Sequence, residues 1–414
     1  MSWLLIVPFV LMLLAIALLP LVAGPWWERN INKVLVTLVL GLPIAGYLLL
    51  QGEAGWHSVQ HTLREYVEFM LLLGSLYIIS GSIILRGDLQ ATPVVNGCFL
   101  ALGAVLASIM GTTGASMLLI RPLLQTNAER RYVTHTVIFF IFLVSNIGGC
   151  LTPLGDPPLF LGYLRGVPFT WTLSLWPEWL AMVLILLVVY GVWDTFLHTR
   201  ETPQALQLDR TRIEPLRLQG GSNLLFLGLV IGAVALVPAP WRALLMLAAT
   251  AGSLVLGGTA GRAANKFTYA PIVEVAVLFL GIFLTMAPVL ELLHQHGTSL
   301  GVNTPARLFW AAGGLSSFLD NAPTYMTFFE AARAQTSATF AGATVAGMPA
   351  IWLKAISLGA VCMGANTYIG NGPNFMVKAV AEEAGITMPS FFGYMRYSCL
   401  ILLPLFVGMT LVVF

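Results

Sequence analysis

Two polar segments, rich in glycine, proline and asparagine, interrupt stretches that are otherwise apolar enough to form membrane helices. The first runs from Ser145 to Gly162 (SNIGGCLTPLGDPPLFLG) and the second from Gly364 to Val377 (GANTYIGNGPNFMV). Backbone with unmet hydrogen bonds persists at membrane depth only where it is buried in protein or lines a watery cavity. Broken helices at corresponding places in two halves of a chain indicate a transporter site near the bilayer midplane.

Composition places the chain in the lipid bilayer. Hydrophobic residues make up 58% of it and charged residues only 9%, whereas about a quarter of the residues of a soluble domain are charged. The net charge of +2 is small, and the basic residues form no cluster of the kind that binds nucleic acid. The four cysteines are isolated in apolar segments, without a CxxC pair or a nearby histidine, so we expect no metal cofactor.

Apolar runs of about 17 to 23 residues are long enough to cross the roughly 30 Å hydrocarbon core. Eight such runs are predicted to be plain membrane spans: 3–23, 33–50, 66–85, 177–197, 222–238, 241–258, 271–290 and 393–413. Regions 92–125 and 303–333 each hold two apolar arms around a small or polar centre, and we predict re-entrant hairpins there. Regions 132–165 and 350–383 hold the two broken helices.

The same order of elements occurs twice, which predicts an all-α polytopic membrane protein built from an internal repeat. Residues 1–197 contain three spans, a hairpin, a broken helix and a span; residues 198–221 form a linker; residues 222–414 contain the second series. Five crossings per half is an odd number, so the second half must enter the membrane from the opposite face. The sequence therefore predicts an inverted-topology repeat.

Positive charge predicts the orientation, because short cytoplasmic loops are rich in lysine and arginine. If the termini share one face and the 198–221 linker lies on the other, most of the 20 basic residues fall on the linker's face. The exceptions are Arg64, Arg165, Arg242, Arg307, Arg333 and Lys354. We therefore expect a multi-pass protein of the cell (inner) membrane with a cytoplasmic linker and both termini outside.

Two acids stand out because they fall within the membrane segments. Asp156 lies in the first broken helix and Asp320 at the tip of the second hairpin. An ionisable residue at that depth is costly and is by default a functional candidate. Each could instead cap the helix that follows it, since Asp before an early proline is a favoured helix start. Capping and ion binding are compatible.

Neutral polar side chains accompany these acids at the breaks and at the hairpin tips. They are Thr112, Thr113, Ser116, Ser145, Asn146, Thr152, Asn321, Thr324, Asn366, Thr367, Asn371 and Asn374. If the halves pack face to face, these groups converge with free carbonyls and C-terminal helix ends, which suit small cations, and with N-terminal helix ends, which suit anions. Among them Asn146, Asp156, Asp320 and Asn366 are the candidate Na⁺ ligands. The alternative is that each such group only caps a helix or pairs between helices.

Three segments carry a family resemblance: GTTGASMLLIRP, HTVIFFIFLVSNIGGCLTPLGDPPLFLGYLRGVPF and GANTYIGNGPNF. They resemble the ion transporter superfamily, most closely its citrate-transporter-like branch of NhaD-type sodium:proton antiporters. The resemblance implies a scaffold domain, a mobile transport domain, a homodimer and elevator-type alternating access. It also places ligand sites at the hairpin tips and helix breaks. The first tip, GTTGAS, lacks the acids that many antiporters of the family carry there.

We therefore expect a secondary active transporter rather than an enzyme, with Na⁺/H⁺ antiport as the leading hypothesis and Na⁺ or H⁺ as the only coupling ions. Two acids at the breaks, with no basic residue beside them, motivate it. The alternative is Na⁺- or H⁺-coupled transport of citrate or a related carboxylate, held by helix N-termini. An intramembrane hydrolase using Asp156 and Asp320 as a carboxylate pair is a remote alternative, and a channel is another.

Overall fold

The computed structural model describes residues 3–257, 259–265, 267–296, 301–336 and 342–414. Residue 258, the last of one predicted span, lies outside them. Within the described residues the chain is an all-α polytopic membrane protein, and five helices are both long and apolar enough to cross a bilayer. They are Asn30–Leu49, Pro93–Met110, Phe169–His198, Ala270–Leu293 and Phe391–Val413. Pro93–Met110 meets this criterion although we expected it to be one arm of a hairpin.

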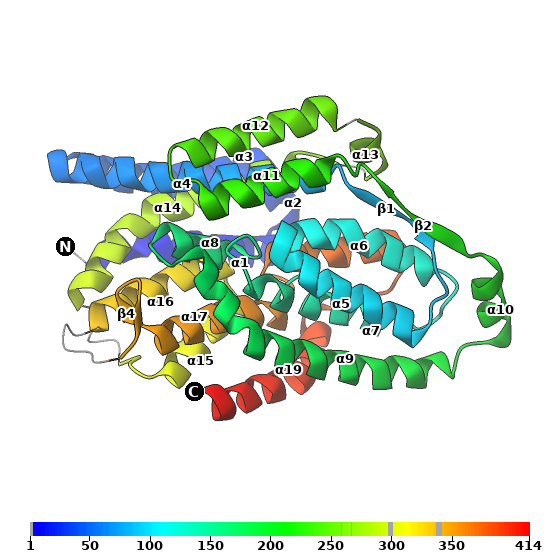
Figure 1. Cartoon of the computed structure of the whole chain (residues 1–414). Coiled ribbons are helices and arrows are strands. Elements are labelled where there is room, and N and C mark those ends of the chain that lie inside the picture. The colour runs from blue at the N-terminus through cyan, green and yellow to red at the C-terminus, as the bar shows by residue number, and fades with distance from the viewer. Residues whose placement is uncertain (1–2, 258, 266, 297–300, 337–341) are drawn as a thin grey trace.

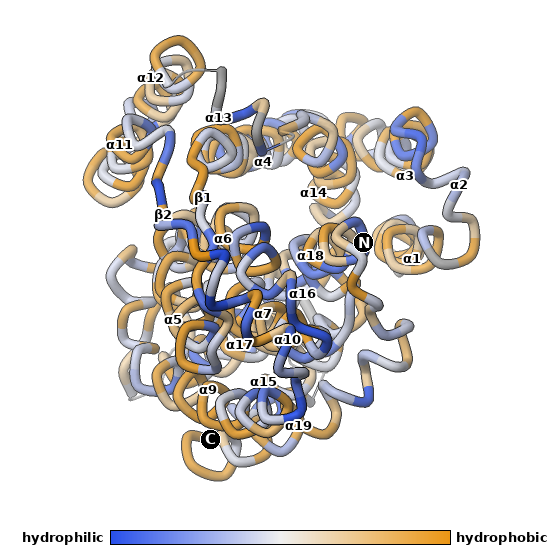
Figure 2. Tube along the Cα trace, turned by 90° about the vertical axis from the view of Figure 1, so that its right-hand side faces the viewer, coloured by the Kyte–Doolittle hydropathy of each residue, from blue (hydrophilic) through white to orange (hydrophobic). Residues whose placement is uncertain are grey.

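The helices form two layers (Figures 1 and 2). The first layer contains α1 (Val7–Val22), α3 (Asn30–Leu49), α4 (Glu53–Ser80), α11 (Asn223–Leu236), α12 (Trp241–Leu256) and α14 (Ala270–His296), with the short α2 (Gly24–Trp27) and α13 (Thr259–Ala264) beside them. The second contains α5 (Pro93–Met110), α6 (Thr112–Thr126), α7 (Thr134–Leu143), α8 (Pro157–Leu164), α9 (Trp176–His198), α15 (Pro305–Ser316), α16 (Asn321–Gln335), α17 (Ala350–Cys362), α18 (Gly372–Glu383) and α19 (Phe391–Val413). The layers meet where α14 packs on α16 and where α4 packs on α6 and α8.

Threonine followed by proline starts three of the helices. Thr92, Thr202 and Thr304 are the N-caps of α5, α10 (Pro203–Thr211) and α15, and each side chain accepts a hydrogen bond from a backbone N–H of the first turn. The proline that follows costs no hydrogen bond, because the first N–H groups of a helix have no intrahelical partner. These local signals determine where the connecting segments end and the helices begin.

Both broken helices lie at the centre of the second layer. In the first, α7 is followed by a 3-10 turn (Ile147–Cys150) and irregular backbone before α8; in the second, α17 is followed by a 3-10 turn (Met363–Asn366) before α18. Every residue from His135 to Leu143 in α7 is buried, and so is nearly every residue of the second half of α17. A helix that is apolar on all sides belongs in the interior. The two hairpins, α5 with α6 and α15 with α16, pack around this core.

Two connections between the layers pair with each other, which the sequence analysis did not anticipate. Strand β1 (Ile84–Asp88) joins α4 to α5, and strand β2 (Glu214–Gln219) joins α10 to α11; the two strands form an antiparallel ribbon. We predicted a span to residue 85 and an irregular linker over 198–221. Instead α4 ends at Ser80, and the linker contains α10 and β2. A second, two-residue pairing joins β3 (Thr344–Val345) to β4 (Met348–Pro349).

Carboxylates gather at one end of the ribbon. Asp88 lies directly opposite Glu214 in the antiparallel register, a placement that is destabilising for like charges. Burial, with smaller contributions from the nearby Glu129, Asp209 and Glu214 and opposed by Arg212, raises the pKa of Asp88 from 3.8 to about 6. At neutral pH the ribbon therefore carries a repulsion that protonation of Asp88 relieves.

We expect Asp88→Asn to be slightly more stable than the wild type at neutral pH. Because the folded-state pKa is raised, the stabilisation from protonated Asp88 is complete below pH 3.8 and is lost as the pH rises through about 6. The difference should stay below about 1 kcal/mol, since solvent screens a partly exposed carboxylate. Thermal unfolding of the purified proteins across this pH range measures it. A difference that grows on acidification would contradict the prediction.

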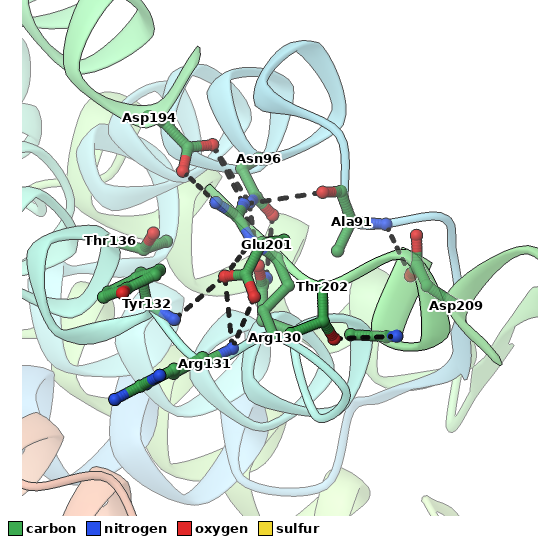
Figure 3. Close-up of polar contacts among 12 residues, drawn as sticks. Ala91, Asn96, Arg130, Arg131, Tyr132, Thr136, Asp194, Glu201, Thr202 and Asp209 are labelled. Atoms are coloured by element: carbon green, nitrogen blue, oxygen red, sulfur yellow. Dashed lines mark hydrogen bonds and ion pairs between the residues drawn. The ribbon is translucent and has the colours of Figure 1, made fainter. Parts of the chain in front are cut away.

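A buried ion-pair network ties the ends of α5, α6, α7 and α9 together (Figure 3). Arg130 donates two hydrogen bonds to Asp194, at 2.6 and 3.1 Å. The same carboxylate lies 2.9 Å from the His135 ring nitrogen and accepts a bond from Asn96 at 3.4 Å. Glu201 accepts bonds from the backbone N–H groups of the residues that follow Arg130. These contacts hold the open end of the first hairpin against the core.

Asp194→Asn should destabilise the protein strongly. It removes the carboxylate that faces a guanidinium whose side chain is 2% exposed, and breaking a buried ion pair on one side costs about 3–5 kcal/mol. Glu382→Gln is the matched control, because its partner Lys378 and Glu382 itself are partly exposed and such pairs contribute less than about 1 kcal/mol. Denaturation midpoints in detergent compare the two. Equal losses would show that the Arg130 network is not a stability centre.

Candidate functional site

Asp156 connects four separate segments of the chain. It is the N-cap residue of α8, yet its side chain makes no capping hydrogen bond. Its carboxylate instead accepts hydrogen bonds from Thr112 at 2.9 Å, from Asn371 at 3.1 Å and from Asn321. Asp156 itself is 1% exposed. We call this set of four residues the Asp156 hub.

Four helices begin at the hub. Thr112 and Asn321 are the first residues of α6 and α16, Asp156 precedes α8, and Asn371 precedes α18. The N-terminal end of a helix carries partial positive charge and unmet N–H groups. A single carboxylate therefore lies where four positive helix ends converge. In the part of the chain that the structure describes, no hydrogen-bond partner of that carboxylate bears a positive charge of its own.

A second set of contacts joins the two breaks directly. Asn146 donates to the side chain of Asn374 at 2.7 Å, and Asn374 in turn donates to the carbonyls of Gly364 and Thr367 at 2.9 Å. Asn371 donates to the Ser145 carbonyl at 3.0 Å. Asparagine side chains thus satisfy carbonyls that the interrupted helices leave without partners.

Hydrogen bonds within each hairpin and its break follow one pattern, used twice. Ser108 donates to the carbonyl of Gly148, Thr152 donates to the carbonyl of Ser108, and the Leu154 N–H donates to the Thr152 hydroxyl at 3.1 Å. These bonds fasten the tip of the first hairpin to the first break.

In the second half the same three bonds recur. Ser317 donates to the carbonyl of Met363 at 3.1 Å, Thr367 donates to the carbonyl of Ser317 at 2.5 Å, and the Ile369 N–H donates to the Thr367 hydroxyl at 3.3 Å. Sequence reasoning missed both serines. A usable signal existed, since Ser108 and Ser317 each lie three residues before the tip residues Gly111 and Asp320.

Several buried amide oxygens near the hub have no hydrogen-bond partner among the described residues: Asn146 Oδ1, Asn321 Oδ1 and Asn366 Oδ1. An unpaired buried acceptor is costly, and neutral oxygens are the ligands that hard cations take. No group of three histidine, cysteine, aspartate or glutamate side chains suited to a metal ion occurs in the described part of the chain. The oxygens therefore fit an alkali cation better than a transition metal.

Of the remaining predicted residues, some lie beside the hub or contact the hairpin serines, and others make contacts elsewhere. Ser116 and Ser145 lie beside the hub with their hydroxyls 3.0 Å apart, and Asn366 donates to Ser317 at 2.9 Å. Asp320 instead caps its own helix, accepting from the Ala322 N–H at 3.1 Å, and the Thr324 hydroxyl donates to the Asp320 carbonyl. Thr113 makes no described hydrogen bond to the hub.

The whole chain, residues 1–414, matches a family model described as "Putative citrate transport". The chain belongs to this family. Membership confirms the citrate-transporter-like resemblance of the GTTGAS, SNIGG and GANTY segments, and it supports secondary transport as the general activity. No curated protein matches the sequence.

Gly155→Ala should disrupt the hub. A methyl group there would lie 2.8 Å from the carbonyl carbon of Gly149 and 2.9 Å from its Cα, so the backbone of the first break, which contains both glycines, must move. Gly97→Ala is the control, because nothing lies within 4 Å of a methyl group at that position and alanine favours helix. We expect the Gly155 variant to lose monodispersity in detergent gel filtration and the control to keep it. A well-behaved Gly155→Ala protein would count against the close backbone approach of Gly149 and Gly155 in the first break.

Proposed function

We propose that this protein is a secondary active transporter that exchanges Na⁺ for H⁺ at the Asp156 hub. The observation that carries the proposal is a buried carboxylate whose hydrogen-bond donors among the described residues are all neutral and come from three other segments. An ionised carboxylate in such surroundings needs a counter-ion, and a proton or a cation can supply it in turn. Because one site serves both ions, binding of one displaces the other, which is the requirement for antiport.

The unpaired amide oxygens support a cation beside Asp156. Asn321 presents its Nδ2 to the carboxylate, while its buried Oδ1 has no partner among the residues that the structure describes. The same is true of the Oδ1 atoms of Asn146 and Asn366. A Na⁺ ion held by carboxylate, amide and hydroxyl oxygens would pair these acceptors. Thr112, Asn146, Asp156, Asn321 and Asn366 are the residues that we assign to it, with Na⁺ and H⁺ as the coupling species.

Transport of citrate or a related carboxylate is the second candidate. The family description favours it, and the four converging helix N-termini suit an anion. Asp156 already places a negative charge at those helix ends, however, and its hydrogen-bond partners among the described residues include no arginine or lysine. A tricarboxylate could enter there only after a coupling ion had neutralised Asp156, and it would find no cationic side chain among those partners, which is why we place it second.

We further propose an inverted repeat, residues 1–197 and 222–414, with the first layer as scaffold and the second as a moving transport domain. The paired hydrogen-bond pattern of Ser108 and Ser317 supports the repeat. The two-layer arrangement supports an elevator-type movement, since the hub lies wholly within the second layer. The proposal includes a homodimer in the inner membrane, both termini outside and a cytoplasmic 198–221 linker, as the distribution of basic residues predicts.

The hydrolase alternative requires that Asp156 and Asp320 share a proton. Among the described contacts the oxygens of Asp156 bind Thr112, Asn321 and Asn371, and Asp320 caps α16. The geometry therefore favours transport over acid–base catalysis by these two acids. Saturable, gradient-coupled flux would separate a transporter from a channel.

Asp156→Asn should abolish exchange, because an amide can neither release a proton nor neutralise Na⁺. In proteoliposomes with a trapped pH dye, Na⁺ added outside should enter in exchange for internal H⁺, so the lumen should become alkaline with the wild type and stay unchanged with the variant. Asp88→Asn is the matched control: it makes the same chemical change outside the hub and should exchange like the wild type. Robust exchange by Asp156→Asn would refute the assignment.

The same proteoliposomes distinguish the two substrates. Labelled citrate accumulating under a Na⁺ or proton gradient, with no proton movement when Na⁺ is added alone, would favour the carboxylate transporter over the antiporter.

A further inference from the structure

Arg165 bridges the two layers at the end of α8. Its guanidinium bonds both oxygens of Glu65 on α4, in the first layer, each at 2.8 Å. It also donates to Glu330 on α16, in the second layer, at 3.0 Å. The side chains of Arg165 and Glu65 are only 18% and 13% exposed. Arg165 therefore pairs with one carboxylate of its own layer, Glu330, and with one of the other layer, Glu65.

Tyr163, two residues earlier on α8, makes a second bridge. Its hydroxyl donates to the carbonyl of Val234 on α11 at 2.8 Å and accepts from Arg242 on α12 at 2.7 Å. The Arg242 guanidinium also lies over the tyrosine ring, 5.1 Å from its centroid. Arg242 in turn pairs with Glu68 on α4, which belongs to its own layer. A cavity of about 450 Å³ adjoins these groups.

Both arginines keep a carboxylate of their own layer if the layers separate. Arg165 would retain Glu330, and Arg242 would retain Glu68. Glu65 would then face the exposed His61 ring, 3.7 Å away, and the adjoining cavity. Opening a buried ion pair is costly chiefly because it strands a charge. Here neither guanidinium is stranded, whereas in the Arg130 network all partners belong to one layer.

We propose that Arg165 and Tyr163, with Glu65 and Arg242, form an interlayer latch that stabilises the relative position of the two layers in this structure and opens when the transport domain moves. The inference rests on the proposed elevator movement. The latch biases which position of the transport domain is populated, so weakening it should shift populations without changing the Asp156 hub.

The test measures distances between the layers instead of transport. Spin labels are placed at Gln60→Cys on α4 and Thr170→Cys beside α9, both exposed, after the exposed Cys98 and Cys399 have been replaced by serine. Double electron–electron resonance in liposomes should give one dominant distance for this background. Glu65→Gln should raise a second population several-fold, and Tyr163→Phe should raise the same population less.

Glu178→Gln is the matched control, since its partner Lys354 lies 2.5 Å away and both residues belong to the second layer. It should leave the distances unchanged. If Glu65→Gln or Tyr163→Phe, folded as judged by gel filtration, gives the distance distribution of the background, the latch is overturned. The latch and the proposed ions can fail separately. If the latch variants alter the distances but the wild-type protein exchanges no Na⁺ for H⁺, the latch is supported and only the assignment of Na⁺ and H⁺ is contradicted.

Discussion

The convergence of four helix N-termini on one carboxylate is the interaction on which the middle of this molecule depends. Each end of α6, α8, α16 and α18 brings partial positive charge and unmet N–H groups to the same place, and like ends repel in a medium of low dielectric constant. Asp156 places the compensating charge between them, and Thr112, Asn321 and Asn371 connect it to the other three segments. The packing of the two halves and the chemistry of the site therefore have the same origin.

Local signals let the sequence predict the helices and the breaks closely. Proline and glycine, such as those around Asp156, interrupt the hydrogen bonding of a helix whatever their distant neighbours are. Thr–Pro pairs start helices through contacts within a single turn. The all-α membrane class follows from apolar length alone. The contact between Asn146 and Asn374 could not be predicted from local signals. It was expected only because the two breaks occupy matching places in the two halves, which is seen only when the halves are compared.

Features that depend on distant partners were not predicted. Ser108 and Ser317 look like ordinary small residues in apolar helices, and their importance arises from carbonyls of another segment. Strands β1 and β2 are only five and six residues long, too short for their sequences to be distinguished from connecting loops. They are also separated along the chain by all the helices from α5 to α10, so nothing local indicates that they pair. The sequence predicted only on which face of the membrane Arg165 lies, and its partners on α4 and α16 can be identified only from the fold.

Each half of the chain supplies the same pattern of hydrogen bonds, but at the position of Asp156 in the first half the second half has Asn371, which carries no charge. Asp156 follows Thr152 by four residues, and Asn371 follows Thr367 by four; their side chains meet at 3.1 Å. A second aspartate at 371 would put two carboxylates within hydrogen-bond reach, where both cannot be ionised without a large penalty. Because residue 371 is an asparagine, its amide donates a hydrogen bond to Asp156 where an aspartate would repel it. The asymmetry between Asp156 and Asn371 is therefore what allows a near-symmetric site to hold one ionised acid, and a single acid that alternates between a proton and a cation is the simplest device for exchange.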